Sequence, residues 1–165
     1  MSRTPSPRSL LAAATLLLLA SLQTVSAHFQ IVYPAWRGNT LHSDNQWEYP
    51  CGGIGVTTNR TKWPISGGQI SIIPGWNAGH PTSFFYVNMG FGSEPPNMTN
   101  IMIPIFQTTG PSRDPFPGEF CLTQVPLPKN ASVHVGDNAT IQVIQVALHG
   151  ASLYNVGLSF LRVGG

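Results

Sequence analysis

The chain has 165 residues, of which 42 % are hydrophobic and only 8 % are charged, a length and composition typical of one globular domain. Two of its eight Lys and Arg residues precede residue 28, whereas all six acidic residues follow it, so the remaining side-chain charge is about zero with His neutral. That balance excludes an electrostatic attraction to nucleic acid or to an anionic membrane surface.

The first predicted element is a secretory leader. Arg3 and Arg8 precede an apolar run over residues 10–20, and Val25-Ser26-Ala27 is a small-residue cleavage site. No second apolar stretch of about 18 residues follows, so no transmembrane span is predicted. The C-terminal residues do not form the hydrophobic tail of a lipid-anchor signal. The expected organisation is a signal peptide over residues 1–27 and one domain over residues 28–165.

Cleavage after Ala27 would make His28 the first residue of the mature protein. The α-amine and the ring Nδ1 of an N-terminal histidine can close a chelate on one metal ion. One further imidazole completes a flat set of three nitrogens, which suits Cu(II). Any residue can follow a cleavage site, however, and by position alone an N-terminal histidine is most often a solvated chain end.

The mature chain contains short apolar runs rich in β-branched and aromatic residues, separated by Gly- and Pro-containing turns. This spacing predicts an all-β sandwich. Alternation places Ile141, Val143 and Gln145 on one face of the last run. The predicted strands cover residues 29–33, 69–73, 83–89, 101–106 and 139–147.

Two cysteines, Cys51 and Cys121, occur in the chain. In an oxidising compartment, the simplest prediction is one disulfide that closes a long loop. The alternative is that each cysteine normally has another partner. Their spacing does not fit a zinc site. Four sequons predict glycans that would compensate for the scarcity of charge, at Asn59, Asn97, Asn130 and Asn138.

An ordered series of motifs resembles one family, the fungal copper acquisition factors. These are secreted proteins similar to lytic polysaccharide monooxygenases that keep the copper site without the oxidative activity. The resemblance covers nearly the whole mature chain up to about Asn155. Its motifs are HFQIVYPAWRG from His28, PCGG around Cys51, NRTKWPISGG from Asn59, Gly79-His80-Pro81, GEFCL from Gly118 and GDNATIQV from Gly136.

The resemblance implies an immunoglobulin-like or fibronectin-like β-sandwich. It also implies one Cu(II) ion in a histidine brace formed by His28 and His80. Without the resemblance, His80 is better interpreted as an ordinary loop residue. His42 and His134 are expected in loops, and His149 is a minor candidate near the metal.

After Leu153-Tyr154-Asn155, the chain departs from the family pattern. Relatives continue with Cys-Ala-Asp, whose aspartate is a plausible third ligand, whereas this chain continues with Val156 and Gly157. Asp137 is a substitute candidate, but an Asp in Gly-Asp-Asn is most often a turn former.

Because Val-Gly codons begin with the GT of a splice donor, residues 156–165 are interpreted as intron read-through, and the sandwich is expected to lack its last strand. The alternative is a genuine divergent C-terminus. A cDNA that reads through Val156 to Gly165 and then stops would refute the splice interpretation.

The predicted function is a secreted or cell-surface copper(II)-binding protein, not an enzyme. It is expected to be a monomer that passes copper to an importer or another acceptor at the cell surface. The resemblance implies that full-length relatives are anchored to the plasma membrane by a lipid. Two alternatives remain open, a copper-dependent lytic polysaccharide monooxygenase and a metal-free structural domain of the cell wall.

Overall fold

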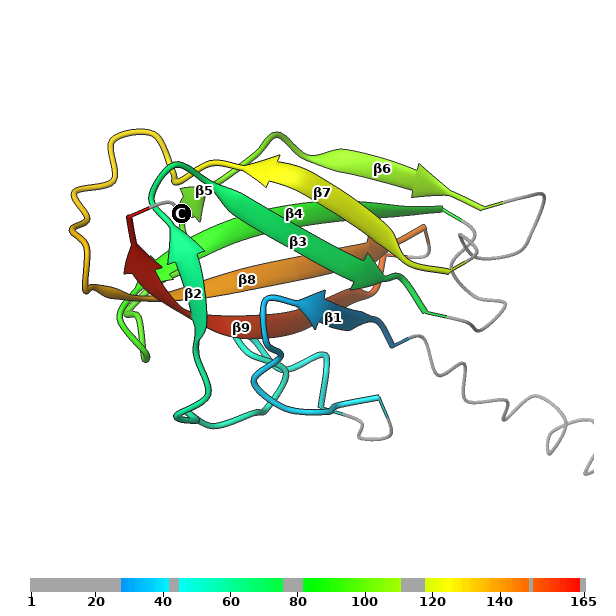
Figure 1. Ribbon diagram of the computed structural model, residues 1–165. Helices are drawn as coiled ribbons and strands as arrows, with labels where there is room; N and C mark the ends of the chain where they lie inside the picture. Colours follow the sequence, from blue (N-terminus) through cyan, green and yellow to red (C-terminus); the bar gives the residue numbers. More distant parts are fainter. Residues whose placement is uncertain (1–27, 42–44, 76–81, 111–117, 149, 164–165) are drawn as a thin grey trace, which may run out of the picture.

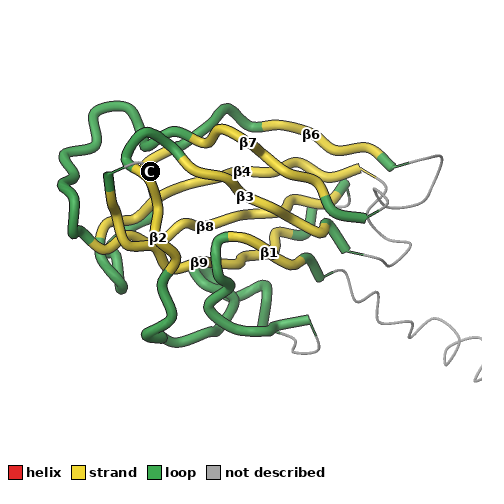
Figure 2. The backbone as a smooth tube through the Cα atoms, in the orientation of Figure 1, coloured by secondary structure: helices red, strands yellow, loops and turns green. Residues whose placement is uncertain are grey.

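The computed structural model describes residues 28–41, 45–75, 82–110, 118–148 and 150–163. Within these ranges the chain forms strands and loops and no helix, so none of them contains a helix that could cross a membrane (Figure 2). The nine strands are β1 (Gln30–Tyr33), β2 (Thr61–Pro64), β3 (Gly68–Ile73), β4 (Thr82–Phe91), β5 (Asn100–Ile101), β6 (Phe106–Thr109), β7 (Phe120–Val125), β8 (Asn138–Ala147) and β9 (Ser152–Arg162).

The strands form two sheets that pack face to face, which confirms the predicted β-sandwich. The smaller sheet has the order β1-β3-β7 and is antiparallel. The larger sheet has the order β2-β9-β8-β4-β5, with β6 also paired to β4, and its β2–β9 pair is parallel. In Figure 1, β3 and β7 cross in front of β4 and β8.

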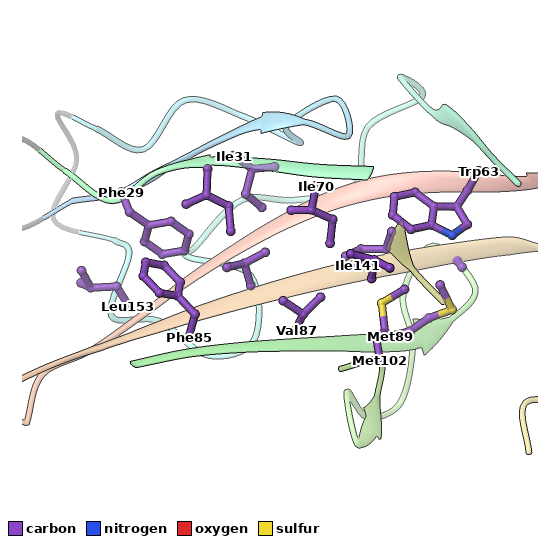
Figure 3. Close-up of a cluster of buried hydrophobic side chains, with 14 of the residues drawn as sticks. Phe29, Ile31, Trp63, Ile70, Phe85, Val87, Met89, Met102, Ile141 and Leu153 are labelled. Carbon is purple, nitrogen blue, oxygen red and sulfur yellow. The ribbon is translucent and has the colours of Figure 1, made fainter. Parts of the chain in front are cut away.

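The hydrophobic core lies between the sheets because alternate residues of each strand point inward. Phe29, Ile31 and Ile70 come from the side of the smaller sheet, and Phe85 and Val87 come from β4 (Figure 3). Ile141, Val143 and Gln145 of β8 are all fully buried, as the alternation predicts. Phe29 and Phe85 meet edge to face, with their ring centroids 6.1 Å apart.

Most predicted strands are present, with ends shifted by one or two residues. The run 101–106 is instead divided into β5 and β6, and Pro104 lies between them. Proline has no N–H to donate to a sheet, which explains the interruption. The strands β2 and β7 were not predicted. The strand β2 has only four residues and ends in Pro64, so its sequence has little alternation to detect.

The last strand differs from expectation. Residues 156–162 are not missing from the sandwich but continue β9, an eleven-residue strand between β8 and β2. Val156, Leu158 and Leu161 are buried there, so these residues have the apolar character that an interior strand needs. The interpretation of residues 156–165 as intron read-through remains a prediction for transcript sequencing.

The disulfide predicted between Cys51 and Cys121 is absent, and both thiols are free. Phe120 and Leu122 pack on the core, so Cys121 between them lies on the outer face of the smaller sheet. Cys51 follows Pro50, whose carbonyl accepts a hydrogen bond from Gln142 on the outer face of β8. Because packed sheets are about 10 Å apart, cysteines on opposite outer faces exceed the span of about 7 Å between Cα atoms that a disulfide allows.

Candidate metal site

His28 precedes β1 at the end of the sandwich where β3 ends and β4 begins (Figure 1). Only 7 % of its surface is exposed. A Cβ added to Gly75 would lie 2.4 Å from the His28 carbonyl oxygen, and Gly75 has φ +96°. Both facts require glycine at this position. The main chain of His28 is therefore in close contact with the segment that leaves β3.

The main chain of the next residue, Phe29, is bound by two side chains from elsewhere in the sequence. Its N–H donates to Gln46 Oε1 (3.1 Å), and its carbonyl accepts from Gln46 Nε2 and Asn155 Nδ2 (2.9 Å each). Gln46 is fully buried and Asn155 is 1 % exposed. The side-chain amide of Gln46 thus pairs with Phe29 as a neighbouring strand would.

Further hydrogen bonds connect this pairing to β9 and to the loop after β1. Gln46 Nε2 also donates to Thr40 Oγ1 (2.8 Å), and Trp36 Nε1 donates to Asn155 Oδ1 (2.5 Å). The main-chain carbonyl of Gln46 accepts from Tyr154 N–H (2.6 Å). A buried polar network whose members are hydrogen-bonded is rigid, so it fixes the chain on the C-terminal side of His28.

The imidazole of His28 has an aromatic neighbour in Trp47. The two ring centroids are 5.9 Å apart, and the planes meet at 66°. Trp47 remains 44 % exposed. Trp36 is hydrogen-bonded to Asn155, and Tyr154 packs edge-on against Tyr49 at 5.5 Å.

His80 lies outside the described residues, but both described ends of the segment that contains it meet at one side chain. Gln145 Nε2 donates to the Pro74 carbonyl and to Ser83 Oγ, at 2.9 Å each. Gln145 is fully buried, and its Oε1 has no hydrogen-bond partner among the described residues. This amide therefore joins the end of β3 to the start of β4, beside the main chain of His28.

The other candidate ligands do not approach His28 within the described ranges. Asp137 forms a turn in which its Oδ2 accepts from His134 N–H (2.7 Å) and its N–H donates to the His134 carbonyl (3.1 Å). This turn precedes β8, at the opposite end of the sandwich from His28 (Figure 1). His134 lies in a loop, as expected, and is exposed. His42 and His149 lie outside the described residues.

The described residues supply only part of a copper donor set. No group of three or more His, Cys, Asp and Glu residues gathers in the part of the chain that the structure describes. If the predicted leader is removed after Ala27, His28 fits a copper ligand in its chemistry, because one residue would then offer an amine and an imidazole. The flat set of three nitrogens that suits Cu(II) would then need one further nitrogen from another residue.

A surface cavity elsewhere, of about 360 Å³, is lined by Cys51, Arg37 and Glu48 among others. Burial raises the pKa of the Cys51 thiol, and the charge of Arg37 partly opposes that rise. The Arg37 guanidinium donates to the carbonyls of Ser93 (2.8 Å) and Ile54 (3.3 Å). His28 does not line this cavity, so the cavity is separate from the candidate metal site.

The sequence profile described as copper acquisition factor BIM1-like matches residues 26–156. This chain belongs to the BIM1-like copper acquisition factor family. Membership gives it a copper-related function. The matched stretch includes His28 and His80 and ends at Val156, where the sequence departs from the family motif.

Several relatives of this protein have names that refer to lytic polysaccharide monooxygenases. It is 50 % identical over 174 residues to the lytic polysaccharide monooxygenase-like protein X325 of Aspergillus fumigatus, covering 92 % of this chain and 72 % of the relative. It is 48 % identical over 163 residues to the lytic polysaccharide monooxygenase-like protein ham-7 of Neurospora crassa, covering 92 % and 71 %.

One solved structure, the AA10 lytic polysaccharide monooxygenase from Streptomyces lividans, is similar at 13 % identity with a TM-score of 0.37. The similarity covers 70 % of this chain and 65 % of that one and is too low to bear on function.

Proposed function

We propose that this protein captures Cu(II) outside the cell in a histidine brace. In this brace, the mature amino group and Nδ1 of His28 and one ring nitrogen of His80 bind one copper ion. The observation that carries the proposal is the convergence at one end of the sandwich. There, the main chain of His28 contacts Gly75, and Gln145 joins both described ends of the segment that contains His80.

The chemistry of the donors supports copper rather than calcium or magnesium, because nitrogen ligands suit Cu(II) and oxygen ligands suit the harder cations. Each donor nitrogen has to be free of a proton before it binds the metal. Copper affinity should therefore fall as the solution becomes more acidic.

Copper is the cargo in this proposal, and no reaction is assigned to the protein. We expect a monomer that releases copper to an importer or another acceptor at the cell surface. Secretion follows from the predicted leader. The four sequon asparagines are all exposed, which agrees with glycosylation of a secreted protein. Mass spectrometry before and after enzymatic deglycosylation of secreted material tests that part.

The decisive experiment compares the mature protein, beginning at His28, with the same protein carrying one extra N-terminal alanine. The extension turns the amine into an amide and should abolish tight Cu(II) binding in a chelator competition assay. His80→Ala should have a comparable effect. His134→Ala is the matched control, because His134 is exposed at the opposite end. Equal affinity of the extended and mature forms would contradict the brace.

A second candidate function is oxidative polysaccharide cleavage. The exposed aromatic side chain beside His28 favours it, since Trp47 contacts the His28 ring and is 44 % exposed. The names of the relatives point the same way. The copper-loaded protein with a reductant should form little peroxide and no oxidised oligosaccharides if it only binds copper. Sustained turnover on a polysaccharide would replace binding by catalysis. Failure of the mature protein to bind copper would instead favour a metal-free structural role.

A further inference from the structure

We propose that Gln46 is a positioning residue for copper, which holds the main chain next to His28 in its binding geometry before the metal arrives. The inference rests on the proposed function of the histidine brace. Gln46 would not touch the metal. It would act through Phe29, because its side chain makes two hydrogen bonds with the main chain of Phe29.

The hydrogen bonds of Gln46 account for its burial. A glutamine is mostly exposed in folded proteins, and burial of its amide is unfavourable unless the polar atoms are hydrogen-bonded. Here Oε1 accepts from Phe29 N–H, and Nε2 donates to the Phe29 carbonyl and to Thr40 Oγ1. Any apolar side chain of similar size would leave the Phe29 N–H without this acceptor.

The bond to the Phe29 N–H matters for His28 because both residues share one peptide group. The Cα and carbonyl of His28 lie in the same plane as the N–H of Phe29. Gln46 fixes the N–H side of that plane, and the close approach of Gly75 confines the carbonyl side. The position of the His28 Cα and the axis of its Cα–C bond are thereby restricted, so that rotation about this one bond is what remains to place the amine.

The next residue along the chain, Trp47, confines the ring of His28. Its indole meets the imidazole edge-on at 5.9 Å. Two consecutive residues thus confine His28. Gln46 holds the peptide group between His28 and Phe29, and Trp47 contacts the imidazole ring of His28. Since the amine and Nδ1 chelate one ion, a fixed relation between them reduces the ordering that binding requires.

The competing explanation is that Gln46 only joins the loop after β1 to β9, where its carbonyl accepts from Tyr154 N–H. Two substitutions separate the explanations. Gln46→Met keeps length and apolar contact but removes all three side-chain hydrogen bonds. Gln46→Glu keeps an acceptor for Phe29 N–H but loses the donor to the Phe29 carbonyl.

Gln142→Met is the matched control. Gln142 is also fully buried and makes two side-chain hydrogen bonds, to the Pro50 carbonyl (2.7 Å) and from Asn88 Nδ2 (3.2 Å), but none to Phe29. A general loss of buried amide hydrogen bonds should affect it as strongly as Gln46→Met. A positioning role should not.

Three measurements are made on mature proteins that begin at His28. They are the Cu(II) dissociation constant by chelator competition, the electron paramagnetic resonance spectrum of bound Cu(II), and hydrogen exchange of the Phe29 amide without copper. Gln46→Met should weaken copper binding by about 10- to 100-fold, as substitutions of residues that orient metal ligands do. It should also alter the spectrum and expose the Phe29 amide. The copper affinity of Gln46→Glu should lie between those of Gln46→Met and the wild type, and Gln142→Met should match the wild type in all three measurements.

The proposal is overturned if Gln46→Met exposes the Phe29 amide yet keeps the affinity and spectrum of the wild type, or if Gln142→Met loses as much affinity. If Gln46→Met does not fold, the test passes to Gln46→Glu. A folded Gln46→Glu variant that binds copper with wild-type affinity would also overturn the proposal. If the wild-type protein does not bind copper, both the proposed function and this inference are wrong. If the wild-type protein binds copper and the Gln46 variants bind it equally well, only this inference is wrong.

Discussion

At the scale of single residues, close approach decides which positions tolerate a side chain. Gly68 faces the fully buried indole of Trp63, and a Cβ placed on Gly68 would lie 2.8 Å from the ring. An aromatic ring inside a packed core cannot move aside without displacing its own neighbours. Gly68 is therefore required for packing and not for its backbone conformation.

We expect Gly68→Ala to lower the free energy of unfolding by about 1–3 kcal/mol, the usual effect of overpacking a core. Urea denaturation measures the change. Gly55→Ala is the control, since no atom lies within 4 Å of the added Cβ, and such surface changes stay within about 0.5 kcal/mol. Equal effects of the two substitutions would show that the Trp63 contact is unimportant.

The two cysteines should differ in reactivity. Burial raises the pKa of the Cys51 thiol, and since the thiolate is the reacting form, less of it is present near neutral pH. Cys121 is exposed on β7. Iodoacetamide should alkylate Cys121 first, as measured by peptide mass spectrometry over time in the folded protein. In urea the difference should vanish, and faster labelling of Cys51 in the folded state would contradict this account.

At the scale of elements, β8 does more than pair with β4 and β9. Its inward-facing Gln145 joins the end of β3 to the start of β4 through Pro74 and Ser83. A single strand of the larger sheet thus fixes the segment ends on which the proposed second copper ligand depends.

We expect Gln145→Leu to lower the free energy of unfolding by about 1–3 kcal/mol, because the buried Pro74 carbonyl loses its donor. Copper affinity should fall as well. Thr140→Val is the control on the same strand, since Thr140 Oγ1 donates to the Gly92 carbonyl at the opposite end. Urea denaturation measures the free energy of unfolding of both variants, and copper titration measures their affinity. If Gln145→Leu loses stability but keeps its copper affinity, the hydrogen bonds of Gln145 do not position the second copper ligand.

At the scale of the whole molecule, β9 holds the larger sheet together, because it pairs with β8 on one side and with β2 on the other. Leu161 near its end is fully buried in the core cluster, whereas its neighbour Phe160 is 39 % exposed. The second half of β9 therefore stabilises the fold whatever the origin of its sequence.

Leu161→Ala should destabilise the protein by about 2–5 kcal/mol, the range for large-to-small changes in a core. Phe160→Ala should have a clearly smaller effect. Cooperative urea denaturation of both variants measures this difference. If Leu161→Ala unfolds at the wild-type midpoint, residues 156–162 do not pack in solution as they do in the structure.

Features that depend on local pattern are predictable from the amino-acid sequence. Alternating apolar runs predicted five strands and the inward face of β8, because side chains in a strand alternate strictly between faces. Gly-Asp-Asn predicted the turn at Asp137, which its hydrogen bonds confirm. Family motifs predicted membership in the copper acquisition factors. The leader, the glycans and the histidine brace remain predictions.

Contacts between residues that are distant in the sequence become visible only in the folded chain. Gln46 and Asn155 are 17 and 126 positions from Phe29 and have no local signature. Trp47, next to Gln46, was missed for the same reason. The number of cysteines predicts one disulfide, but Cys51 and Cys121 lie on opposite faces of the sandwich and are both free. Partners across a sandwich depend on which strand faces lie opposite each other, and sequence periodicity gives the face of a residue but not what lies across from it.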